Sequence, residues 1–313
     1  MKNKNLNSPL KKIGGGMLAG FLMPGAAFGC ACGCGVFDVG TSSMFPSDEG
    51  GMAFLNYAYQ DQNQNHNGTS DAPAANNNDK EIRTSFVTPG LQYMFNRSWG
   101  VQAEFPYDFR YFRTRDDAGN IVSRSWSALG DIRIEGIYTG FSEDLSGGVT
   151  FGLKLPTGSY NRDADVVDRD TQIGTGSTDI LLGGFYRHDF VSGTGWQWFT
   201  QAKLDVPTLI QAGYRPGVEG DAAAGINYRG WNWGRAHIAP IAQIIGSVRG
   251  RDNGTAADPG NSGYQRILLA PGIEFHLHPV KIYADVELPV YQNMKGNQLV
   301  APALFKLGVS YMF

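Results

Sequence analysis

Long stretches of this sequence alternate between apolar and polar residues, and this period of two limits the fold more than any other feature. In residues 101–111 the odd positions are apolar or aromatic, whereas the even positions between them include Glu104, Asp108 and Arg110. A β-strand places successive side chains on opposite faces of its sheet. The segment therefore predicts a strand with one apolar face and one charged face.

The same alternation recurs at 127–141, 196–206, 280–290 and 301–313, with rows of up to seven apolar residues. At about 3.3 Å per residue and a tilt of about 45°, such strands are long enough to cross a bilayer core. A soluble β-sandwich also alternates, but its strands are usually only about 5–6 residues long. It would not normally need strands of this length with rows of inward charge. The pattern favours a membrane-spanning barrel.

Turn and loop residues divide the chain into strands. We predict them at about 51–60, 82–96, 99–113, 127–141, 145–156, 177–190, 196–207, 218–230, 233–249, 263–277, 280–290 and 300–313. Short connections lie near 96–98, 142–144, 191–195, 230–232 and 278–279. Long polar connections occupy about 61–81, 114–126, 157–176, 208–217, 250–262 and 291–299. An even strand count and alternating short and long connections are typical of bacterial outer-membrane barrels, whose short turns are periplasmic.

The fold class we predict is all-β, a transmembrane antiparallel up-and-down β-barrel of about 12 strands formed by residues 51–313. We expect it in the outer membrane of a Gram-negative cell, surrounded by lipid, with both termini in the periplasm. Trp99, Trp196, Trp198, Trp231 and Trp233 lie beside the short turns, where an aromatic girdle would meet the headgroups. The terminal Tyr311-Met312-Phe313 resembles the C-terminal signal that the barrel assembly machinery recognises.

The N-terminus indicates export. Four lysines among residues 2–12 precede an apolar stretch that ends in small residues, so residues 1–29 predict a cleaved signal peptide. The alternative is a helical anchor, but the stretch is short and is interrupted by Gly14-Gly15-Gly16 and Pro24. Residues 30–50 would then form a periplasmic segment that contains cysteines. The formal net charge of -3 gives no indication of a nucleic-acid partner.

Two glycine-containing segments in the middle of the chain resemble a known family. They are Pro156-Thr157-Gly158 and Gly174-Thr175-Gly176-Ser177, and a Gly130-Asp131 pair opens another strand. In these motifs the chain resembles the outer-membrane transporter-like β-barrel family associated with the meta pathway of phenol degradation, over about residues 85–313. The resemblance implies a barrel tied to the passage of small, often aromatic or apolar compounds. The cysteine segment is not part of that family's pattern.

The strand positions that alternate with the apolar residues carry charged side chains of both signs. We expect these side chains to face the lumen and to form either a narrow, weakly selective pore or a sealing lattice of ion pairs. The candidate lumen residues are Glu104, Asp108, Arg110, Asp131, Arg133, Glu135, Lys203, Asp205, Asp285 and Glu287.

Cys30, Cys32 and Cys34 allow several interpretations. Cys30 follows an apolar run and could be lipidated, the three thiolates could bind a soft metal such as Cu(I) or Zn, and Cys32 could form a disulfide with Cys34. A segment with no metal and no catalytic role is a further alternative. We expect no cofactor beyond this candidate metal.

Other chemistry has weaker support. Four aspartates in residues 161–170 could bind Ca²⁺, but Arg162 and Arg169 favour a neutralised, solvated loop. No Gly-x-Ser-x-Gly, phosphate loop or His-Glu-x-x-His motif is present. His66 lies near Ser70, but in an Asn-rich loop, and neither His237 nor His276 has a Ser at a spacing that would pair with it. We therefore expect a channel for small solutes rather than an enzyme. The rival hypotheses are a closed barrel whose cysteine segment docks a metal or redox partner, and an outer-membrane hydrolase.

Overall fold

The computed structural model describes residues 45–46, 49–190 and 192–313. The predicted signal peptide, residues 1–29, and the three cysteines lie outside the described residues. Within the described ranges, no helix is both long enough and apolar enough to cross a membrane.

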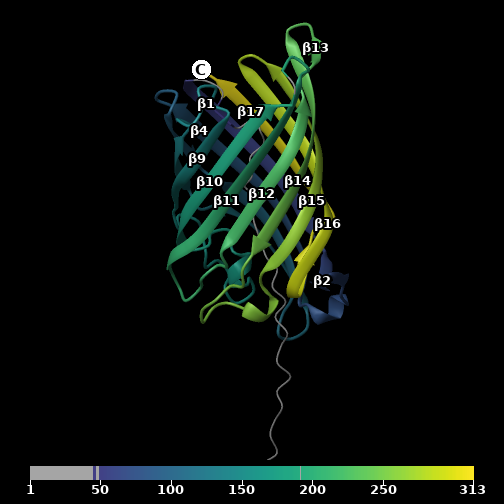
Figure 1. Ribbon diagram of the computed structural model, residues 1–313. Helices are drawn as coiled ribbons and strands as arrows, with labels where there is room; N and C mark the ends of the chain where they lie inside the picture. Colours follow the sequence, from purple (N-terminus) through teal and green to yellow (C-terminus); the bar gives the residue numbers. More distant parts are fainter. Residues whose placement is uncertain (1–44, 47–48, 191) are drawn as a thin grey trace, which may run out of the picture.

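Twelve antiparallel strands close into a barrel (Figure 1), as predicted. The first strand, β1 (Gly50–Gln62), pairs along one edge with the last strand, β17 (Leu304–Met312), and along the other with β4 (Asp79–Met94). Closure gives the backbone groups of the first and last strands partners within the barrel. In hydrocarbon an unpaired group would cost several kcal/mol, so a closed barrel satisfies what lipid requires of a sheet.

The remaining strands follow in chain order around the wall. They are β5 (Trp99–Glu104), β6 (Tyr107–Arg115), β7 (Ile121–Leu129), β8 (Arg133–Tyr138), β9 (Gly147–Lys154), β10 (Ser177–Asp189), β11 (Trp196–Ile210), β12 (Glu219–Tyr228), β13 (Trp231–Trp233), β14 (Ala236–Arg249), β15 (Tyr264–Leu277) and β16 (Val280–Val300). Short elements in the connections are β2 (Gln64–Gly68), β3 (Ser70–Asp71), η2 (Ala74–Asn76), η3 (Arg169–Thr171) and η4 (Pro259–Asn261).

The two ends of the barrel differ. The connections β4–β5, β8–β9, β10–β11 and β15–β16 lie at the end that carries the C-terminus, and we call this the short-turn end. The connections β9–β10, β11–β12 and β14–β15 lie at the other, the long-loop end. Trp99, Trp196, Trp231 and Trp233 are exposed near the short-turn end, as the girdle prediction requires.

The outer face of the wall is apolar where the alternation predicted it. On β10 Ile180, Leu182 and Tyr186 are exposed, whereas Asp179, Leu181 and the residues of the same parity face inward. On β17 Phe305, Leu307 and Val309 are exposed, and Lys306 lies on the inner face. The barrel therefore presents an apolar band outward and a largely polar surface inward.

Two predicted strands are broken in the structure. The predicted strand 99–113 divides into β5 and β6 at Pro106, and the predicted strand 127–141 divides into β7 and β8 at residues 130–132. Gly130 donates its N–H to the Pro106 carbonyl at 2.8 Å, so the two breaks lie side by side. The parity of the strand changes across the second break. An unbroken alternation over 127–141 would put Ala128 on the same face as Ile134, but Ile134 is exposed and Ala128 packs inward.

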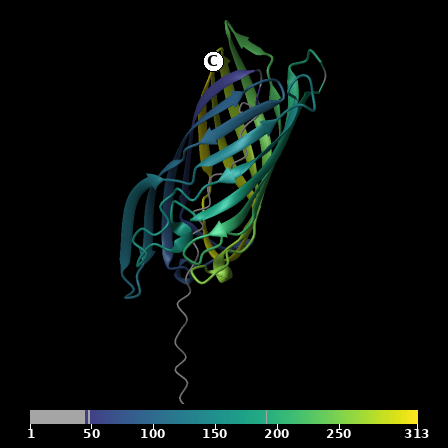
Figure 2. The same cartoon turned by 90° about the vertical axis from the view of Figure 1, so that its left-hand side faces the viewer.

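Beyond the breaks the wall opens along one edge of a hairpin. β5 pairs with β8 and β8 pairs with β9, whereas β6 stays paired with β4 and pairs on its other edge with β7. Among the described residues, β6 is the strand with which β7 pairs, so the far edge of β7 leaves the wall. Figure 2 shows this hairpin standing away from the barrel at the long-loop end. The predicted loop 114–126 was therefore wrong over its second half, because β7 begins at Ile121.

Two other predicted loops also contain strand. The predicted loop 61–81 holds β2 and β3, and residues 291–299 belong to β16, which continues to Val300. β2 pairs with the distal part of β16, so the wall extends on this side of the barrel beyond the lengths we predicted.

The outward band gives a test of membrane insertion. Leu182, at the middle of β10, should face the hydrocarbon centre, whereas Leu209 lies at the long-loop end of β11. Leu182→Arg should lower the free energy of unfolding by about 2–4 kcal/mol and Leu209→Arg by about 0–1 kcal/mol. Denaturant titration in lipid vesicles measures both, and equal losses would contradict the placement of β10 across a bilayer.

Candidate functional site

A cavity of about 250 Å³ lies inside the barrel and is lined mainly by inward residues of the wall and by residues of the β9–β10 and β11–β12 loops. Its lining holds eight acidic and eight basic side chains. The acidic ones are Glu104, Asp108, Asp131, Asp170, Asp179, Asp205, Glu219 and Asp221, and the basic ones are Arg110, Arg133, Lys154, Arg169, Lys203, Arg249, Lys281 and Lys306. The formal charge of the lining is therefore zero.

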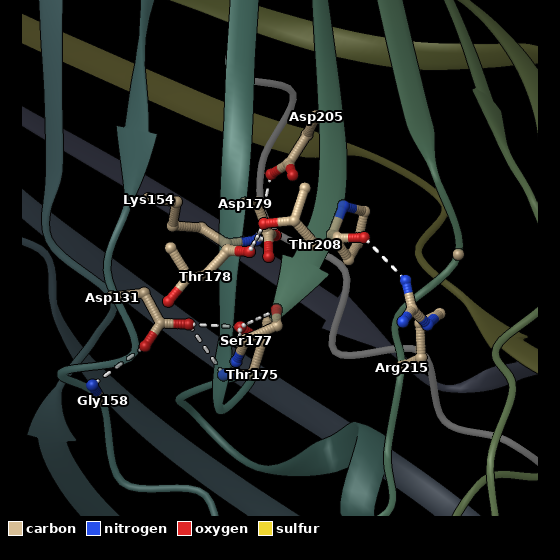
Figure 3. A network of polar contacts seen from close by, with 12 residues as sticks. Asp131, Lys154, Gly158, Thr175, Ser177, Thr178, Asp179, Asp205, Thr208 and Arg215 are labelled. Carbon is tan, nitrogen blue, oxygen red and sulfur yellow. Dashed lines mark hydrogen bonds and ion pairs between the residues drawn. The ribbon is translucent and has the colours of Figure 1, made fainter. Parts of the chain in front are cut away.

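Strand register brings the first group of charges together. Lys154 on β9 lies directly opposite Asp179 on β10, and Asp205 follows on β11. The Lys154 Nζ is 3.0 Å from the Asp205 Oδ2 and also pairs with Asp179 (Figure 3). Since all three side chains are largely buried, each charge depends on the others for compensation.

A second pair crosses several strands. The Lys203 Nζ on β11 reaches the Glu135 Oε1 on β8 at 3.1 Å. Gly152 lies directly opposite Glu135, and Gly183 lies directly opposite Lys203, so neither position places a side chain between them. Beside this pair, the Arg133 Nη1 is 3.7 Å from the Glu104 Oε2. Together these contacts form a belt of alternating charge around the middle of the lumen.

All ten predicted lumen residues face the interior, but in different settings. Glu104, Asp108, Arg110, Asp131, Arg133, Lys203 and Asp205 line the cavity. Glu135 is held by Lys203. On β16 the Glu287 Oε1 pairs with the Lys306 Nζ at 2.6 Å, and Asp285 accepts a hydrogen bond from the Gln243 amide at 3.1 Å. The structure brings most of these charges into pairs rather than leaving them as a ring of one sign.

Asp131 joins the two ends of the β9–β10 loop. Its Oδ1 accepts from the Gly158 N–H at 2.9 Å, and its Oδ2 accepts from the N–H and the hydroxyl of Thr175 at 2.8 and 2.6 Å (Figure 3). The Thr157 hydroxyl donates to the Gly130 carbonyl at 3.0 Å and accepts from the Ile132 N–H at 2.9 Å. We call Gly130, Asp131, Thr157, Gly158, Gly174 and Thr175 the loop clasp.

The geometry of the loop clasp explains why glycines stand in the two motif segments, 156–158 and 174–177. A Cβ at Gly158 would lie 2.6 Å from the Gly174 Cα, and a Cβ at Gly174 would lie 2.3 Å from the Gly158 carbonyl carbon. Gly176 has a φ of +66°, which favours glycine. Ser177 is buried beside Thr175, and Pro156 leads into the clasp. The motif residues therefore close a loop in this chain.

The clasped loop covers the lumen at the long-loop end. Val167 and Ile173 pack against Ile82, Phe112 and Trp126 on the inner face of β4, β6 and β7. The Arg110 guanidinium donates to the Gln172 carbonyl at 3.1 Å and to the Thr171 carbonyl. The Arg169 guanidinium lies over the rings of Tyr160 and Tyr214, at 4.8 and 4.6 Å from their centroids. The loop is thus tied to the interior from both sides.

The four aspartates of residues 161–170, which we considered as Ca²⁺ ligands, do not come together at one point. Asp163 pairs with Arg124 on β7, their charged atoms being 3.6 Å apart. Among the residues that the structure describes, no group of three His, Cys, Asp or Glu side chains could hold a metal.

Sequence reasoning missed an aromatic cluster in the lumen. Phe45, Phe199, Ile241 and Tyr283 are buried together, with Phe185 against them. Phe199 and Tyr283 stand on the polar parity of their strands, between Gln197 and Gln201 and between Lys281 and Asp285. The sequence did carry a signal for this cluster, because Phe199 and Tyr283 are aromatic residues at strand positions where the neighbours of the same parity are polar.

The clasp can be tested by one substitution. Asp131→Asn places an amide N–H₂ against at least one of the donors that now face a carboxylate, and a hydrogen bond to a charged group contributes about 1.5–3 kcal/mol. Hydrogen exchange in peptides that cover 157–176 should therefore accelerate about tenfold or more. Asp117→Asn, in an exposed loop, is the control. Equal exchange in the two variants would show that Asp131 does not hold the loop.

The same loop should respond to pH. Burial, reinforced by the nearby Asp258, raises the pKa of Asp168 from 3.8 to about 6. Because this folded-state pKa lies above the ordinary value, the protonated carboxyl favours the packed loop below pH 4, and this contribution is lost as the pH rises through 6. We expect lower protection of the loop at pH 7 than at pH 5, after correction for intrinsic exchange rates. Asp168→Asn should remove most of this difference in protection between pH 5 and pH 7. If the difference were unchanged in the variant, a group other than Asp168 would be responsible for it.

No family model matches this sequence, and no curated protein matches it. Among solved structures, the barrel is similar to the COG4313 outer membrane channel from Pseudomonas putida F1, with 13% identity, 88% of this chain and 100% of that chain covered, and a TM-score of 0.65. It is also similar to the beta domain of the Bordetella autotransporter BrkA, with 13% identity, 85% and 100% coverage, and a TM-score of 0.52. At these identities the likeness shows the fold alone, which is that of an outer-membrane β-barrel.

Proposed function

We propose that this protein is a passive outer-membrane channel for small solutes, aromatic or apolar ones among them. The observation that carries the proposal is a cavity lined by balanced charges inside a closed wall whose outer face is apolar. A barrel of this size lies between small barrels filled by side chains and open porins. The interior space and the inward charges support passage rather than a solid core.

In this proposal the long-loop end faces outside the cell and the short-turn end faces the periplasm, with both termini there. A solute enters past the clasped loop, crosses the belt of paired charges and leaves at the short-turn end. The similar structure from Pseudomonas putida is described as an outer membrane channel, which supports the same class of function here. The link to phenol degradation rests only on the motif resemblance.

The charge balance predicts the selectivity. With eight charges of each sign in the cavity lining, the wild-type pore should discriminate weakly between anions and cations. Removal of one charge of an ion pair leaves a net unit charge in the lumen. At about 10 Å in water a unit charge lowers the energy of ions of opposite sign by about 0.4 kcal/mol and raises that of ions of the same sign equally, which changes the anion-to-cation permeability ratio about fourfold.

Two nearly isosteric variants of one ion pair test this. Glu135→Gln removes one negative charge from the lumen and should shift the permeability ratio toward anions by about fourfold, whereas Lys203→Gln removes one positive charge and should shift it toward cations by a similar factor. Reversal potentials in planar bilayers under a salt gradient measure both shifts. The double variant should return toward the wild type.

The folded barrel should persist in all three variants as a heat-modifiable band on a gel. Shifts of the same sign in the two single variants, or no shift, would remove this pair from the conduction path. A wild-type protein that is silent in bilayers would instead favour a closed scaffold barrel.

A further inference from the structure

Phe45 lies inside the barrel although it precedes the first strand. Its side chain is 6% exposed and packs with Phe199, Ile241 and Tyr283, which come from β11, β14 and β16. Its ring stacks on Phe185 of β10, with centroids 4.6 Å apart and an interplanar angle of 19°, and meets the Phe199 ring edge-on at 6.3 Å. A single benzene ring thus fills a pocket with aromatic walls.

A polar contact anchors the residue that follows. The Arg187 guanidinium donates to the Pro46 carbonyl at 2.9 Å. Arg187 stands on the inward parity of β10, two residues beyond Phe185. The lumen therefore offers Phe45 an aromatic pocket and Pro46 a hydrogen-bond donor beside it.

On the β11 side the pocket lies nearer the short-turn end than the charged cavity does. The cavity is lined there by Lys203 and Asp205, and Phe199 comes four residues nearer the short-turn end of that strand. Tyr283 belongs to the Phe45 cluster and also lines the cavity, so the two spaces share a wall. On β16 and β17 the cavity reaches Lys281 and Ser310, so a solute that leaves it toward the short turns passes beside the Phe45 cluster.

We propose that Phe45 is a displaceable plug that narrows the lumen near the short-turn end, and that its pocket is a subsite for one benzene ring of a passing solute. This inference rests on the proposed function, because it names a step that a solute completes to leave. The two occupants compete for the same aromatic walls. An uncharged solute with one ring therefore widens the exit by replacing the ring that narrows it.

The plug itself is tested without any conduction. The full-length protein carries 4-fluorophenylalanine at position 45, and its fluorine resonance is recorded in detergent micelles. Stacking on Phe185 should displace the resonance from its position in the denatured protein, and Phe185→Leu should move it part of the way back. A resonance at the denatured position in the otherwise unchanged protein would overturn the plug.

The subsite is tested by titration of the same sample with benzyl alcohol, which has one uncharged ring. We expect the resonance to move toward the exposed position in a saturable way, and cyclohexanol should act more weakly because it lacks an aromatic face. Equal effects of the two alcohols, or no displacement by either, would overturn the aromatic subsite.

Conductance then tests whether the plug gates the pore. Phe45→Ala should raise the open probability about tenfold or more, since it removes the buried ring. Phe95→Ala, which removes an exposed ring near the β4–β5 turn, is the matched control and should not differ from the wild type. Wild-type and Phe45→Ala channels that are equally open would overturn the gate. Silence in every variant would contradict the proposed channel function, while the fluorine resonance still decides whether Phe45 occupies the pocket.

Discussion

Lipid supplies no hydrogen-bond partner to a peptide group, and the rest of this structure follows from that constraint. The chain meets it by pairing β1 with both β4 and β17, so that the sheet has no first or last edge at the wall. Closure divides the side chains into two environments. The outward parity meets hydrocarbon, and the inward parity shares a narrow space in which charges must compensate one another.

The interior is organised in layers along the barrel axis. The clasped loop lies over the long-loop end, the belt that contains Lys154, Asp205 and Lys203 lies across the middle, and the Phe45 pocket lies nearest the short turns. The charges that line the middle layer balance, whereas the layers at the two ends contain close backbone packing and aromatic rings. In the proposed channel a solute would therefore meet narrow regions at the two ends and a weakly selective charged region between them.

The sequence predicts the wall well and the interior poorly, for physical reasons. Alternation predicts a strand because one face of the wall meets lipid along its whole length, and β10 and β15 accordingly lie within one residue of their predicted bounds. The breaks at Pro106 and Gly130 were missed, although a proline inside a strand pattern is a warning sign. The break is stabilised by contacts with Thr157, which lies 27 residues from Gly130 in the chain, and no local pattern reports such contacts.

In the candidate site, too, the sequence predicts which face a residue occupies but not which residues it contacts. Parity placed Glu135 and Lys203 on the inner face, but their pairing depends on the absence of side chains at Gly152 and Gly183 between them. Asp131 was predicted as a lumen charge, and in the structure both of its oxygens are engaged by the ends of a loop. Since three-dimensional partners decide whether an inward charge is free to meet a solute, parity alone predicts location and leaves the role open.

Solute flux through the purified barrel tests the central claim most directly. Liposomes that contain the protein should swell in iso-osmotic solutions of small uncharged solutes, and the rate should fall steeply as the solute approaches the width of the lumen. Absence of swelling with every solute, both in the wild type and in protein with the loop clasp or the Phe45 plug released, would contradict a solute-conducting interior.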